Sequence, residues 1–242
     1  MILLRSAAFN AWFFGLTFLV GVGGLGVRWF APHRALATAR LWSWLVLAGL
    51  RRICGIRVVV TGREHLPAGG PALIASQHQS AFDTLIWLEL VPRAAYVHKA
   101  ELRRVPLFGP LLALAGQIGV DRSAGFSALR SLLGGAGRAV AESRQIVIFP
   151  EGTRAGPGEV LPLQPGVAAV SARLGLPVIP VATDSGLRWG RRGFRKLPGT
   201  IHVAIGPPLR VGLSSADLLA ELRASWDAAA GGMAPPLAGP VN

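Results

Sequence analysis

Charged side chains are scarce in this sequence, and acidic ones most of all. Only 15% of its 242 residues are charged against 51% that are hydrophobic, and 25 Lys and Arg outnumber 12 Asp and Glu, a formal charge of +13. A soluble globular protein has a charged fraction of about a quarter, and a disordered basic tail is poor in apolar residues. Both classes are therefore disfavoured. An apolar and basic chain suits an anionic membrane surface, with nucleic acid as the other standard partner.

Cysteine is almost absent, since Cys54 stands alone. A single cysteine excludes an intramolecular disulfide and any C-x-x-C zinc or redox motif, and we expect its thiol to be a small buried apolar group. The histidines, at positions 33, 65, 78, 98 and 202, are scattered along the chain. Only His78 has a chemical companion nearby, and the sequence holds no constellation of metal ligands. We therefore expect no metal.

The N-terminal region holds no acidic residue before Glu64, and residues 6–27 carry no charge at all. As a helix this run would be about 33 Å long at ~1.5 Å per residue, enough to cross a bilayer core. A signal peptide is the alternative because residues 35–37 resemble a cleavage site, but the apolar run is too long for one. Arginines after the run outnumber those before it, so the positive-inside rule places the bulk of the chain in the cytoplasm.

A second apolar stretch, residues 41–50, lies between arginines. It is too short to span a bilayer as a helix. With Trp42 and Trp44 it indicates an interfacial helix with snorkelling arginines, and a helix packed on the globular core is the alternative. Residues 1–56 are thus predicted to form membrane-anchoring helices.

From residue 57 onward, short apolar runs alternate with segments of helical periodicity. Strands are predicted at 57–61, 71–76, 94–97, 117–120, 145–149, 177–182 and 200–205, and helices at 82–90, 107–115, 127–142, 166–174 and 214–227. This alternation predicts an α/β domain over residues 57–230, with a central, largely parallel sheet flanked by helices. The Gly/Pro-rich residues 231–242 are expected to form a flexible tail. Functional residues in such sheets gather beyond the carboxyl ends of the strands.

His78 and Asp83 follow the strand predicted at residues 71–76, in a loop that turns into a helix. A carboxylate at this spacing can accept from one ring nitrogen of the histidine, which leaves the other free to take a proton from a hydroxyl. This is the base and orienter of a catalytic triad without a protein nucleophile. Ser80 is better placed to cap the following helix. Taken alone, the motif favours an ordinary loop histidine beside a capping aspartate.

Two further polar segments follow predicted strands, one around Arg122 and the run Phe-Pro-Glu-Gly-Thr-Arg at residues 149–154. Arginines there can hold a phosphate with two parallel hydrogen bonds. Gly152 allows a tight turn, and Glu151 can orient a neighbouring arginine. Taken singly, each segment is as easily a surface turn with a solvated salt bridge. Residues 176–182 indicate only a buried strand bordered by prolines.

Taken in order, these segments resemble the blocks of one known family. H-x4-D comes first, then a segment with Lys99, Glu101, Pro106 and Gly109, then an arginine after a strand, then F-P-E-G-T-R and L-P-V-I-P-V. Over residues 65–206 the chain thereby resembles the 1-acyl-sn-glycerol-3-phosphate acyltransferases (lysophosphatidic acid acyltransferases). Its apolar N-terminus is also typical of them. The specific part of the resemblance is the pair of H-x4-D and F-P-E-G-T-R.

The resemblance implies the glycerolipid acyltransferase fold and a fatty acyl transfer from a thioester to the sn-2 hydroxyl of 1-acyl-glycerol-3-phosphate, which gives phosphatidate in phospholipid biosynthesis. His78 would be the general base and Asp83 its orienter, and the hydroxyl would attack the thioester directly, without an acyl-enzyme. No cofactor is implied, and acyl-CoA or acyl carrier protein is the co-substrate. The resemblance assigns acceptor binding to Arg122, Glu151, Gly152, Thr153 and Arg154, with Lys99 adding positive charge.

One departure from the family pattern concerns the residues around His78. The first block commonly starts Asn-His, whereas here Gln77 precedes the histidine and Gln79 follows it. The hydrogen bonding around the histidine is therefore open. The donors that stabilise the tetrahedral oxyanion are not evident either, and backbone N–H groups near the helix start at Ser80 are candidates.

A basic cluster with interleaved aromatic residues follows the last block. Its members are Arg188, Arg191, Arg192, Arg195 and Lys196. The cluster suits anionic lipid headgroups or an acidic acyl carrier protein, and a solvated loop is the plain alternative. Such clusters also bind single-stranded nucleic acid, which the apolar N-terminus and the acyltransferase blocks disfavour here. Three functions remain: a membrane-bound lysophosphatidate acyltransferase, an acyltransferase for another lysolipid such as lyso-ornithine lipid, and a non-enzymatic membrane lipid-binding protein.

Overall fold

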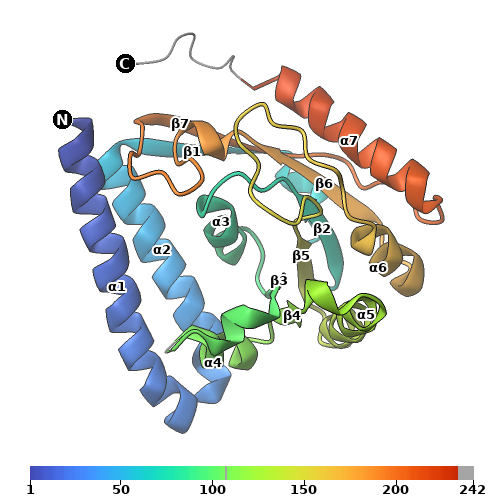
Figure 1. Ribbon diagram of the computed structural model, residues 1–242, viewed down its shortest axis with the longest axis horizontal. Helices are drawn as coiled ribbons and strands as arrows, with labels where there is room; N and C mark the ends of the chain where they lie inside the picture. The colour runs from blue at the N-terminus through green and yellow to red at the C-terminus, as the bar shows by residue number, and fades with distance from the viewer. Residues whose placement is uncertain (107, 234–242) are drawn as a thin grey trace.

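The computed structural model describes residues 1–106 and 108–233, without the side chains of Phe108 and Arg122 (Figure 1). Within these residues seven strands form a single sheet in the order β1-β7-β6-β2-β5-β3-β4. The strands are β1 (Ile56–Thr61), β2 (Ala72–Ser76), β3 (Ala94–Lys99), β4 (Ile118–Val120), β5 (Gln145–Ile148), β6 (Val178–Thr183) and β7 (Gly199–Ile205). All neighbouring strands are parallel except β6 and β7. The predicted, largely parallel sheet is confirmed.

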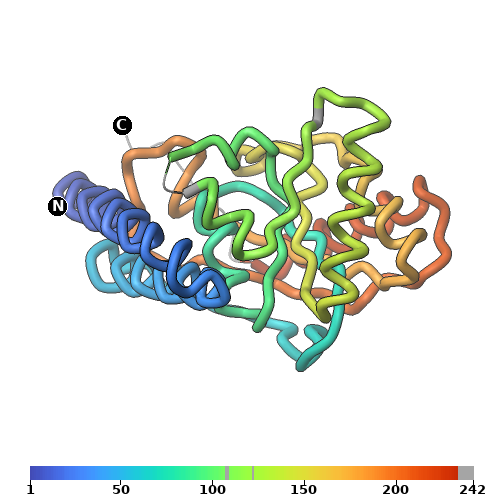
Figure 2. Tube along the Cα trace, turned by 90° about the horizontal axis from the view of Figure 1, so that it is seen from below, coloured from blue at the N-terminus to red at the C-terminus, as the bar shows by residue number. Residues whose placement is uncertain are grey.

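Helices cover both faces of the sheet, as Figure 1 shows, and the first two helices of the chain lie side by side (Figure 2). They are α1 (Ile2–Phe30), α2 (Ala35–Cys54), α3 (Phe82–Leu90), α4 (Phe108–Leu114), α5 (Phe126–Ala141), α6 (Gly166–Leu174) and α7 (Ser215–Gly231). Side chains alternate across a strand, so Ile74 of β2 lies in one core with α1, α2 and α3. Its neighbours Leu73 and Ala75 lie in a second core with α5, α6 and α7. This three-layer arrangement is the predicted α/β fold.

Five neighbouring strands, β6, β2, β5, β3 and β4, run in the same direction. Their carboxyl ends therefore meet at one edge of the sheet, where α/β folds place their functional residues. The loop with His78 follows β2, Arg122 follows β4 and residues 149–154 follow β5. The fold thus brings three segments that are far apart in the sequence to one edge of the sheet.

The helix α1 is longer than the predicted apolar run, and it shares a core with the sheet. Phe9 is fully buried and packs edge-on against Trp189, with ring centroids 5.3 Å apart. Gly49 of α2 makes the close approach of α1 possible, because a Cβ there would lie 2.5 Å from Trp12. Large apolar side chains elsewhere on α1 are exposed, among them Phe14, Phe18 and Leu19. In the described chain, α1 is the one helix long and apolar enough to cross a membrane, by length and composition. Its role as an anchor stays a prediction.

The helix α2 corrects the expectation for residues 41–50. It has 20 residues, and it packs on the globular core as the alternative interpretation had it. Leu50 is buried, and Ser43 Oγ donates a hydrogen bond to the carbonyl of Leu85 in α3 at 2.8 Å. The exposed large apolar side chains of α2 are Leu41 and Trp44. Residues 41–50 are therefore part of a longer helix, and the inward face of that helix packs against α3.

The C-terminal helix α7 starts as predicted, because Ser214 Oγ accepts from the backbone N–H of Asp217 at 3.1 Å and so caps it. The helix continues to Gly231, so the predicted tail begins later than its expected first residue. Residues 234–242 lie outside the described residues. The division into anchoring residues 1–56 and catalytic residues 57–230 stays a prediction about function, since both parts contribute to one core.

Candidate active site

The His78–Asp83 pair predicted from the sequence is formed in the structure. His78 lies in the loop after β2, and Asp83 lies in the first turn of α3. His78 Nδ1 is 3.2 Å from Asp83 Oδ2, and the two side chains are 14% and 2% exposed. When Nδ1–H donates to the carboxylate, Nε2 is the nitrogen left to take a proton. No residue in the described part of the chain hydrogen-bonds Nε2. This geometry agrees with the roles of general base and orienter that the resemblance implies, and those roles stay predictions.

The Asp83 carboxylate is held from several directions. Besides the histidine, Oδ2 accepts from the backbone N–H groups of Gln79 and Ser80, each at 2.7 Å. Its other oxygen, Oδ1, accepts from Ser185 Oγ at 2.6 Å. Ser80 Oγ in turn accepts from the N–H of Phe82 at 3.1 Å, the contact at the helix start expected of this serine. The N–H groups of Gln79 and Ser80 are therefore not available to an oxyanion, because they already bind the aspartate. A role for the remaining N–H groups at this helix start stays a prediction.

The segment after β5 supports the histidine from another side. Phe149 stacks on the His78 ring, with centroids 4.3 Å apart and planes at 24°. Glu151 Oε2 accepts from the backbone N–H of His78 at 2.7 Å, and the carbonyl of His78 accepts from Ala155 N at 2.7 Å. Among the described residues Glu151 forms no ion pair with Arg154. The sequence had indicated that Glu151 orients a neighbouring arginine. In the structure its carboxylate instead holds the backbone of the histidine loop.

Glu151 is a buried acid whose carboxyl titrates near neutral pH. Its side chain is 6% exposed, and burial raises its pKa from 4.5 to about 7. The N–H of His78 and the charge of Arg223 lower this pKa, and the carboxylate of Asp83 raises it. A group that changes charge around pH 7 is thus hydrogen-bonded to the backbone of His78.

The rest of this segment forms the predicted turn and brings an arginine to the site. Gly152 has a φ of +72°, in the left-handed region that favours glycine, and its N–H donates to the carbonyl of Phe149 at 3.0 Å. Thr153 is exposed, and Arg154 is half-buried. Burial lowers the pKa of the Arg154 guanidinium, while the nearby Asp83 carboxylate raises it. The guanidinium is therefore within electrostatic reach of Asp83.

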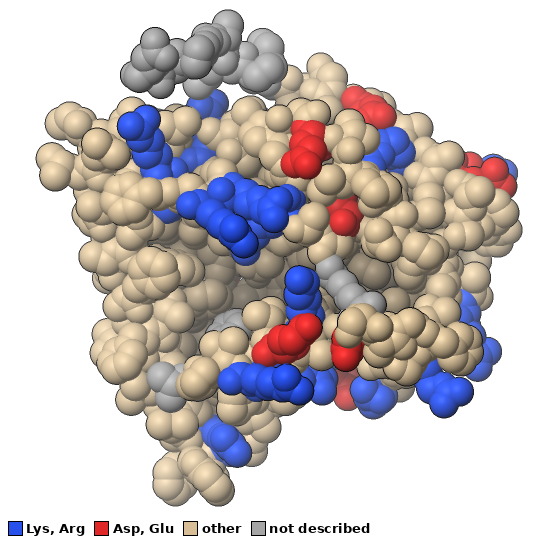
Figure 3. Space-filling view, in the orientation of Figure 1, with Lys and Arg blue, Asp and Glu red and all other residues tan. Residues whose placement is uncertain are grey.

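Two predicted basic residues stand at the ends of the neighbouring strands. Lys99 is the last residue of β3 and is exposed. Arg122 starts the turn η4 (Arg122–Ala124) directly after β4, and its side chain lies outside the described residues. Figure 3 shows Lys and Arg side chains on both sides of a hollow in the face of the molecule that Figure 1 presents. The position of both residues agrees with a basic site at this edge, whereas their contacts with a ligand stay predictions.

The basic cluster predicted after the last block does not form one surface. Lys196 is 3% exposed and donates to the side chain of an α1 residue at 2.8 Å. Arg188 Nε donates to a carbonyl of β7 at 3.2 Å. Arg191 reaches the active site, where its guanidinium donates to the carbonyl of Arg154 at 3.3 Å. The exposed members are Arg191, Arg192 and Arg195. Two of the five cations thus have structural roles, which neither the lipid nor the solvated-loop interpretation anticipated.

Sequence reasoning missed Ser185 and the purpose of the two glutamines beside the histidine. Gln77 Oε1 accepts from the N–H of Thr183 at 3.0 Å, and Gln79 Oε1 accepts from the N–H of Gly186 at 3.1 Å. The glutamines that depart from the family pattern therefore bind the last residue of β6 and the turn that follows it. The sequence signalled this segment only by its place directly after a buried strand.

A second histidine–carboxylate pair corrects the expectation that only one histidine has a companion. On β7, the backbone N–H of His202 donates to Asp184 Oδ1, and its Nδ1 lies by Oδ2, both at 2.7 Å. The pair joins β7 to the turn after β6. Its two contacts are between neighbouring elements, so its evident role is to hold that turn.

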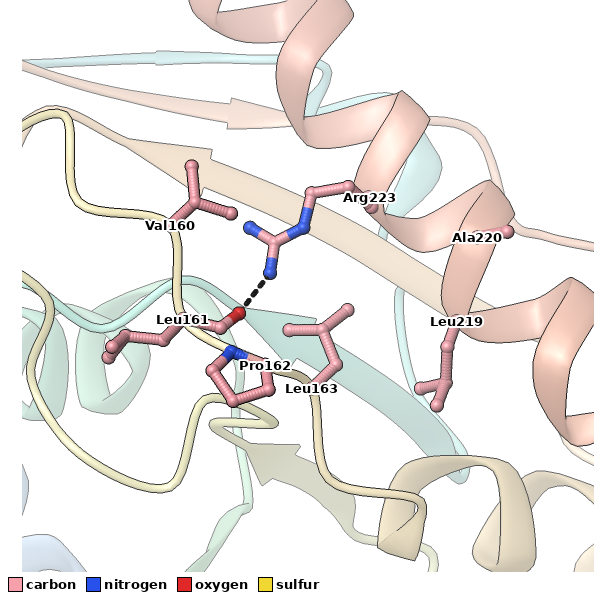
Figure 4. A pocket seen from close by; sticks show the side chains of 7 residues that line it. All are labelled: Val160, Leu161, Pro162, Leu163, Leu219, Ala220 and Arg223. Carbon is pink, nitrogen blue, oxygen red and sulfur yellow. Dashed lines mark hydrogen bonds between the residues drawn. The ribbon is translucent and has the colours of Figure 1, made fainter.

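Two cavities in the described part of the chain lie apart from the His78 ring. One, of about 390 Å³, lies between residues 160–163 and α7, where Arg223 donates to the carbonyl of Leu161 (Figure 4). The other, of about 800 Å³, lies between residues 1–3 and the loop of residues 186–197. In the described part of the chain, no group of three or more His, Cys, Asp or Glu could hold a metal ion.

Comparisons with known sequences point in one direction. The profile of the family described as Acyltransferase matches residues 57–184. A 1-acyl-sn-glycerol-3-phosphate acyltransferase of Pseudomonas aeruginosa is 33% identical over 221 residues, which are 90% of this chain and 86% of that protein. The protein of the same name from Limnanthes alba is 29% identical over 74% of this chain and 63% of its own length. A 1-acyl-sn-glycerol-3-phosphate acyltransferase alpha of Mus musculus is 31% identical over 68% of this chain and 59% of its own length.

A solved structure has the same fold. It is the crystal structure of the 1-acyl-sn-glycerophosphate (LPA) acyltransferase, PlsC, from Thermotoga maritima, with a TM-score of 0.78. The match covers 96% of this chain and 97% of that one, at 22% sequence identity. At this identity the likeness concerns the fold alone. Its coverage is too large to leave out α1, so the shared fold extends into the N-terminal helices.

Proposed function

This chain belongs to the acyltransferase family and, within it, to the 1-acyl-sn-glycerol-3-phosphate acyltransferases, and on that basis we propose that it acylates the sn-2 hydroxyl of 1-acyl-glycerol-3-phosphate (lysophosphatidate) to give phosphatidate. The observation that carries the proposal is the pair of His78 and Asp83, 3.2 Å apart, at the sheet edge that gathers the family's blocks. The acyl donor is a thioester of coenzyme A or of acyl carrier protein. We assign no step to a cofactor or a metal.

In the proposed reaction His78 is the general base. The acceptor hydroxyl gives its proton to His78 Nε2 while its oxygen attacks the carbonyl carbon of the thioester. Asp83 holds the ring through Nδ1–H and stabilises the imidazolium that forms. When the tetrahedral intermediate collapses, the C–S bond breaks and the imidazolium returns the proton to the departing thiolate. The products are the new ester and a free thiol, and His78 is neutral again.

Arg154 supplies the charge that a phosphate monoester needs. Its guanidinium is half-buried and forms no ion pair with the described residues. Arg191 stands beside it, bonded to its carbonyl at 3.3 Å. A phosphate monoester carries about −1.5 to −2 charges and three strong acceptor oxygens, so it matches two neighbouring guanidinium groups. A zwitterionic lysolipid offers less charge to the same groups.

The remaining predicted residues act around this phosphate site. Lys99 and Arg122, at the ends of β3 and β4, add positive charge from the side of the neighbouring strands. Gly152 gives the turn its shape, and the exposed hydroxyl of Thr153 is available to the acceptor. Glu151 acts on the acceptor only indirectly, because its carboxylate is committed to the backbone of the histidine loop.

The proposed substrate is a lipid, so we place the site at an anionic membrane surface. Helix α1 exposes apolar side chains suited to the acyl region, such as those of Phe14, Phe18 and Leu19. Arg5 and Arg28 lie near the two ends of this helix and suit anionic headgroups. The excess of arginines after residue 27 supports a cytoplasmic position for the catalytic residues. Nucleic acid is not among the proposed partners.

Product analysis tests the proposal. The purified protein is offered lysophosphatidate, lyso-ornithine lipid and a zwitterionic lysolipid, each with an acyl-CoA and with an acyl carrier protein thioester. We expect phosphatidate as the main product, with a free thiol released in equal amount. A wild-type preference for lyso-ornithine lipid would contradict the assigned acceptor and keep the chemistry. No ester product with any lysolipid would leave a non-enzymatic lipid-binding protein.

A further inference from the structure

The end of β6 and the turn that follows it are bonded to the histidine loop at three points. The N–H of Gln77 donates to the carbonyl of Val181 at 2.9 Å. The side chain of the same glutamine accepts from the N–H of Thr183 at 3.0 Å, and that of Gln79 accepts from the N–H of Gly186 at 3.1 Å. The histidine is therefore flanked by two residues whose side chains hold one neighbouring segment, residues 183–186.

Within this segment Ser185 reaches the catalytic aspartate itself. Its side chain is fully buried, and its Oγ donates to Asp83 Oδ1 at 2.6 Å. In the described part of the chain, Oδ1 accepts from no other group, while Oδ2 receives His78 Nδ1 and two backbone N–H groups. The two carboxylate oxygens thus have separate tasks, one toward the histidine and one toward the serine.

We propose that Ser185 is a positioning residue for acyl transfer, which holds Asp83 Oδ1 so that Oδ2 faces the ring of His78; this inference rests on the proposed function. The terminal torsion of an aspartate is soft, so one more donor decides which way the carboxylate faces. A hydroxyl bonded to an ionised carboxylate makes one of the stronger and shorter hydrogen bonds in proteins. Without it, a buried acceptor loses its partner and the aspartate gains freedom to turn.

The geometry around Ser185 leaves little room for it to move. A Cβ added at Gly186 would lie 3.0 Å from Gln79 Oε1, so the close contact of the two segments depends on that glycine. On the far side the loop is fixed to α1, where Lys196 Nζ donates to Asn10 Oδ1 at 2.8 Å. Ser185 is therefore held by β6 at one end and by the N-terminal helix at the other.

Substitution of Ser185 by alanine tests this role, with another buried serine as the matched control. Ser171 of α6 is 1% exposed, and its Oγ donates to the carbonyl of Leu176 at 2.7 Å, in the core on the other face of the sheet. Ser185→Ala and Ser171→Ala each remove one buried hydroxyl and leave its acceptor unpaired. We expect Ser185→Ala to lower kcat by about tenfold with the KM of both substrates unchanged, and Ser171→Ala to leave kcat within about twofold.

A third variant keeps a side chain of the same shape and weakens the donor. The thiol of Ser185→Cys is a poor hydrogen-bond donor, so its kcat should lie between those of wild type and Ser185→Ala. This variant also serves if the alanine variant folds poorly, because it leaves no cavity. Thermal unfolding of all variants shows whether the kcat values follow stability or the hydrogen bond.

Three results would overturn the inference while the wild type acylates a lysolipid. They are an unchanged kcat in Ser185→Ala, a loss that appears in KM alone, and equal losses in Ser185→Ala and Ser171→Ala. The assay uses whichever lysolipid the wild type acylates best, so the inference does not depend on lysophosphatidate as the acceptor. A wild-type protein that acylates no lysolipid would instead overturn the proposed function, and this inference with it.

Discussion

The backbone N–H of His78 and the carboxylate of Glu151 are 2.7 Å apart. This hydrogen bond joins the H-x4-D segment to the F-P-E-G-T-R segment, across 73 positions of the chain. The same glutamate is buried, and burial raises its pKa to about 7. The side chain that supports the histidine loop therefore titrates near neutral pH. The stability of the protein should depend on pH for this reason.

We expect the stability of the protein to fall as the pH rises toward 7, because of Glu151. The carboxyl has a pKa of about 7 when folded and 4.5 as an ordinary glutamate. Between these values folding takes up a proton, so the free energy of unfolding falls as the pH rises, and it levels off above about 7. The amide of Glu151→Gln has no proton to take up. Relative to wild type, this variant should gain about 1–3 kcal/mol of stability between pH 5 and pH 8.

Thermal unfolding of the two proteins from pH 5 to pH 8 measures this difference. The matched control is Glu64→Gln, which neutralises an exposed carboxyl that does not act on the pKa of Glu151. We expect the control to follow the wild-type curve. Parallel curves for wild type and Glu151→Gln would show that the buried carboxyl does not titrate in this range.

Removal of the Arg154 side chain should weaken the binding of the acceptor and leave the binding of the donor unchanged. We expect Arg154→Ala to raise the KM for lysophosphatidate. The rise should correspond to a loss of about 1.5–3 kcal/mol of binding free energy, the value of a hydrogen bond to a charged group. Arg122→Ala should act in the same direction, because Arg122 follows β4 at the same edge of the sheet. Steady-state kinetics with each substrate varied in turn measures both effects. Arg192→Asn, an exposed arginine at a φ of +55°, removes one charge nearby and serves as the control.

An unchanged KM for lysophosphatidate in both Arg154→Ala and Arg122→Ala would contradict the assigned phosphate site. A rise in the KM of the thioester alone would move these arginines to the donor. An equal effect of Arg192→Asn would mean that the net charge of the surface matters, rather than particular guanidinium groups.

The packing of α1 predicts that the N-terminal helix is part of the fold. Phe9 is fully buried against Trp189, so Phe9→Ala should destabilise the protein by about 3–5 kcal/mol, the range for a buried phenylalanine. Phe14→Ala changes an exposed residue of the same helix and should have little effect in detergent. Chemical unfolding in detergent compares them. Equal stabilities of the two variants would mean that α1 is a detachable anchor.

Membrane attachment should resist salt, because apolar contacts are not screened. We expect the full-length protein to stay with membranes in high salt and to be released by detergent. Deletion of residues 1–34 is a poor test, since it also removes the core residue Phe9. Replacement of the exposed Phe18 and Leu19 by serine weakens attachment without that loss. Quantitative release of the wild type by salt alone would contradict the insertion of α1.

The features that the sequence predicted well are local. Strand and helix bounds follow from short apolar runs and caps, and the His78–Asp83 pair lies within one loop and one helical turn. Contacts between distant residues were not predictable in this way. Ser185 bonds Asp83 across 102 positions, and Lys196 bonds Asn10 across 186. A serine after a strand and a lysine in a basic run look ordinary until the sheet and α1 bring their partners to them.

The burial of α2 illustrates the same limit. Residues 41–50 are apolar enough for a membrane interface or for a core, and composition does not distinguish the two environments. The decision comes from polar anchors on the inward face, where Ser43 binds a carbonyl of α3 and Arg40 binds the carbonyl of Val91 at 3.1 Å. Both anchors join residues more than 40 positions apart.

The most direct test of the account is the rate of acyl transfer to lysophosphatidate by His78→Ala, measured beside Asp83→Asn and the wild type. The account predicts a loss of about 10²–10⁴-fold in kcat for His78→Ala, in a protein that unfolds at nearly the wild-type temperature. Asp83→Asn should also be strongly impaired, because the amide presents the wrong partner to the ring. Phosphatidate formation by His78→Ala at close to the wild-type rate would contradict the role of this histidine as the base, and with it the proposed mechanism.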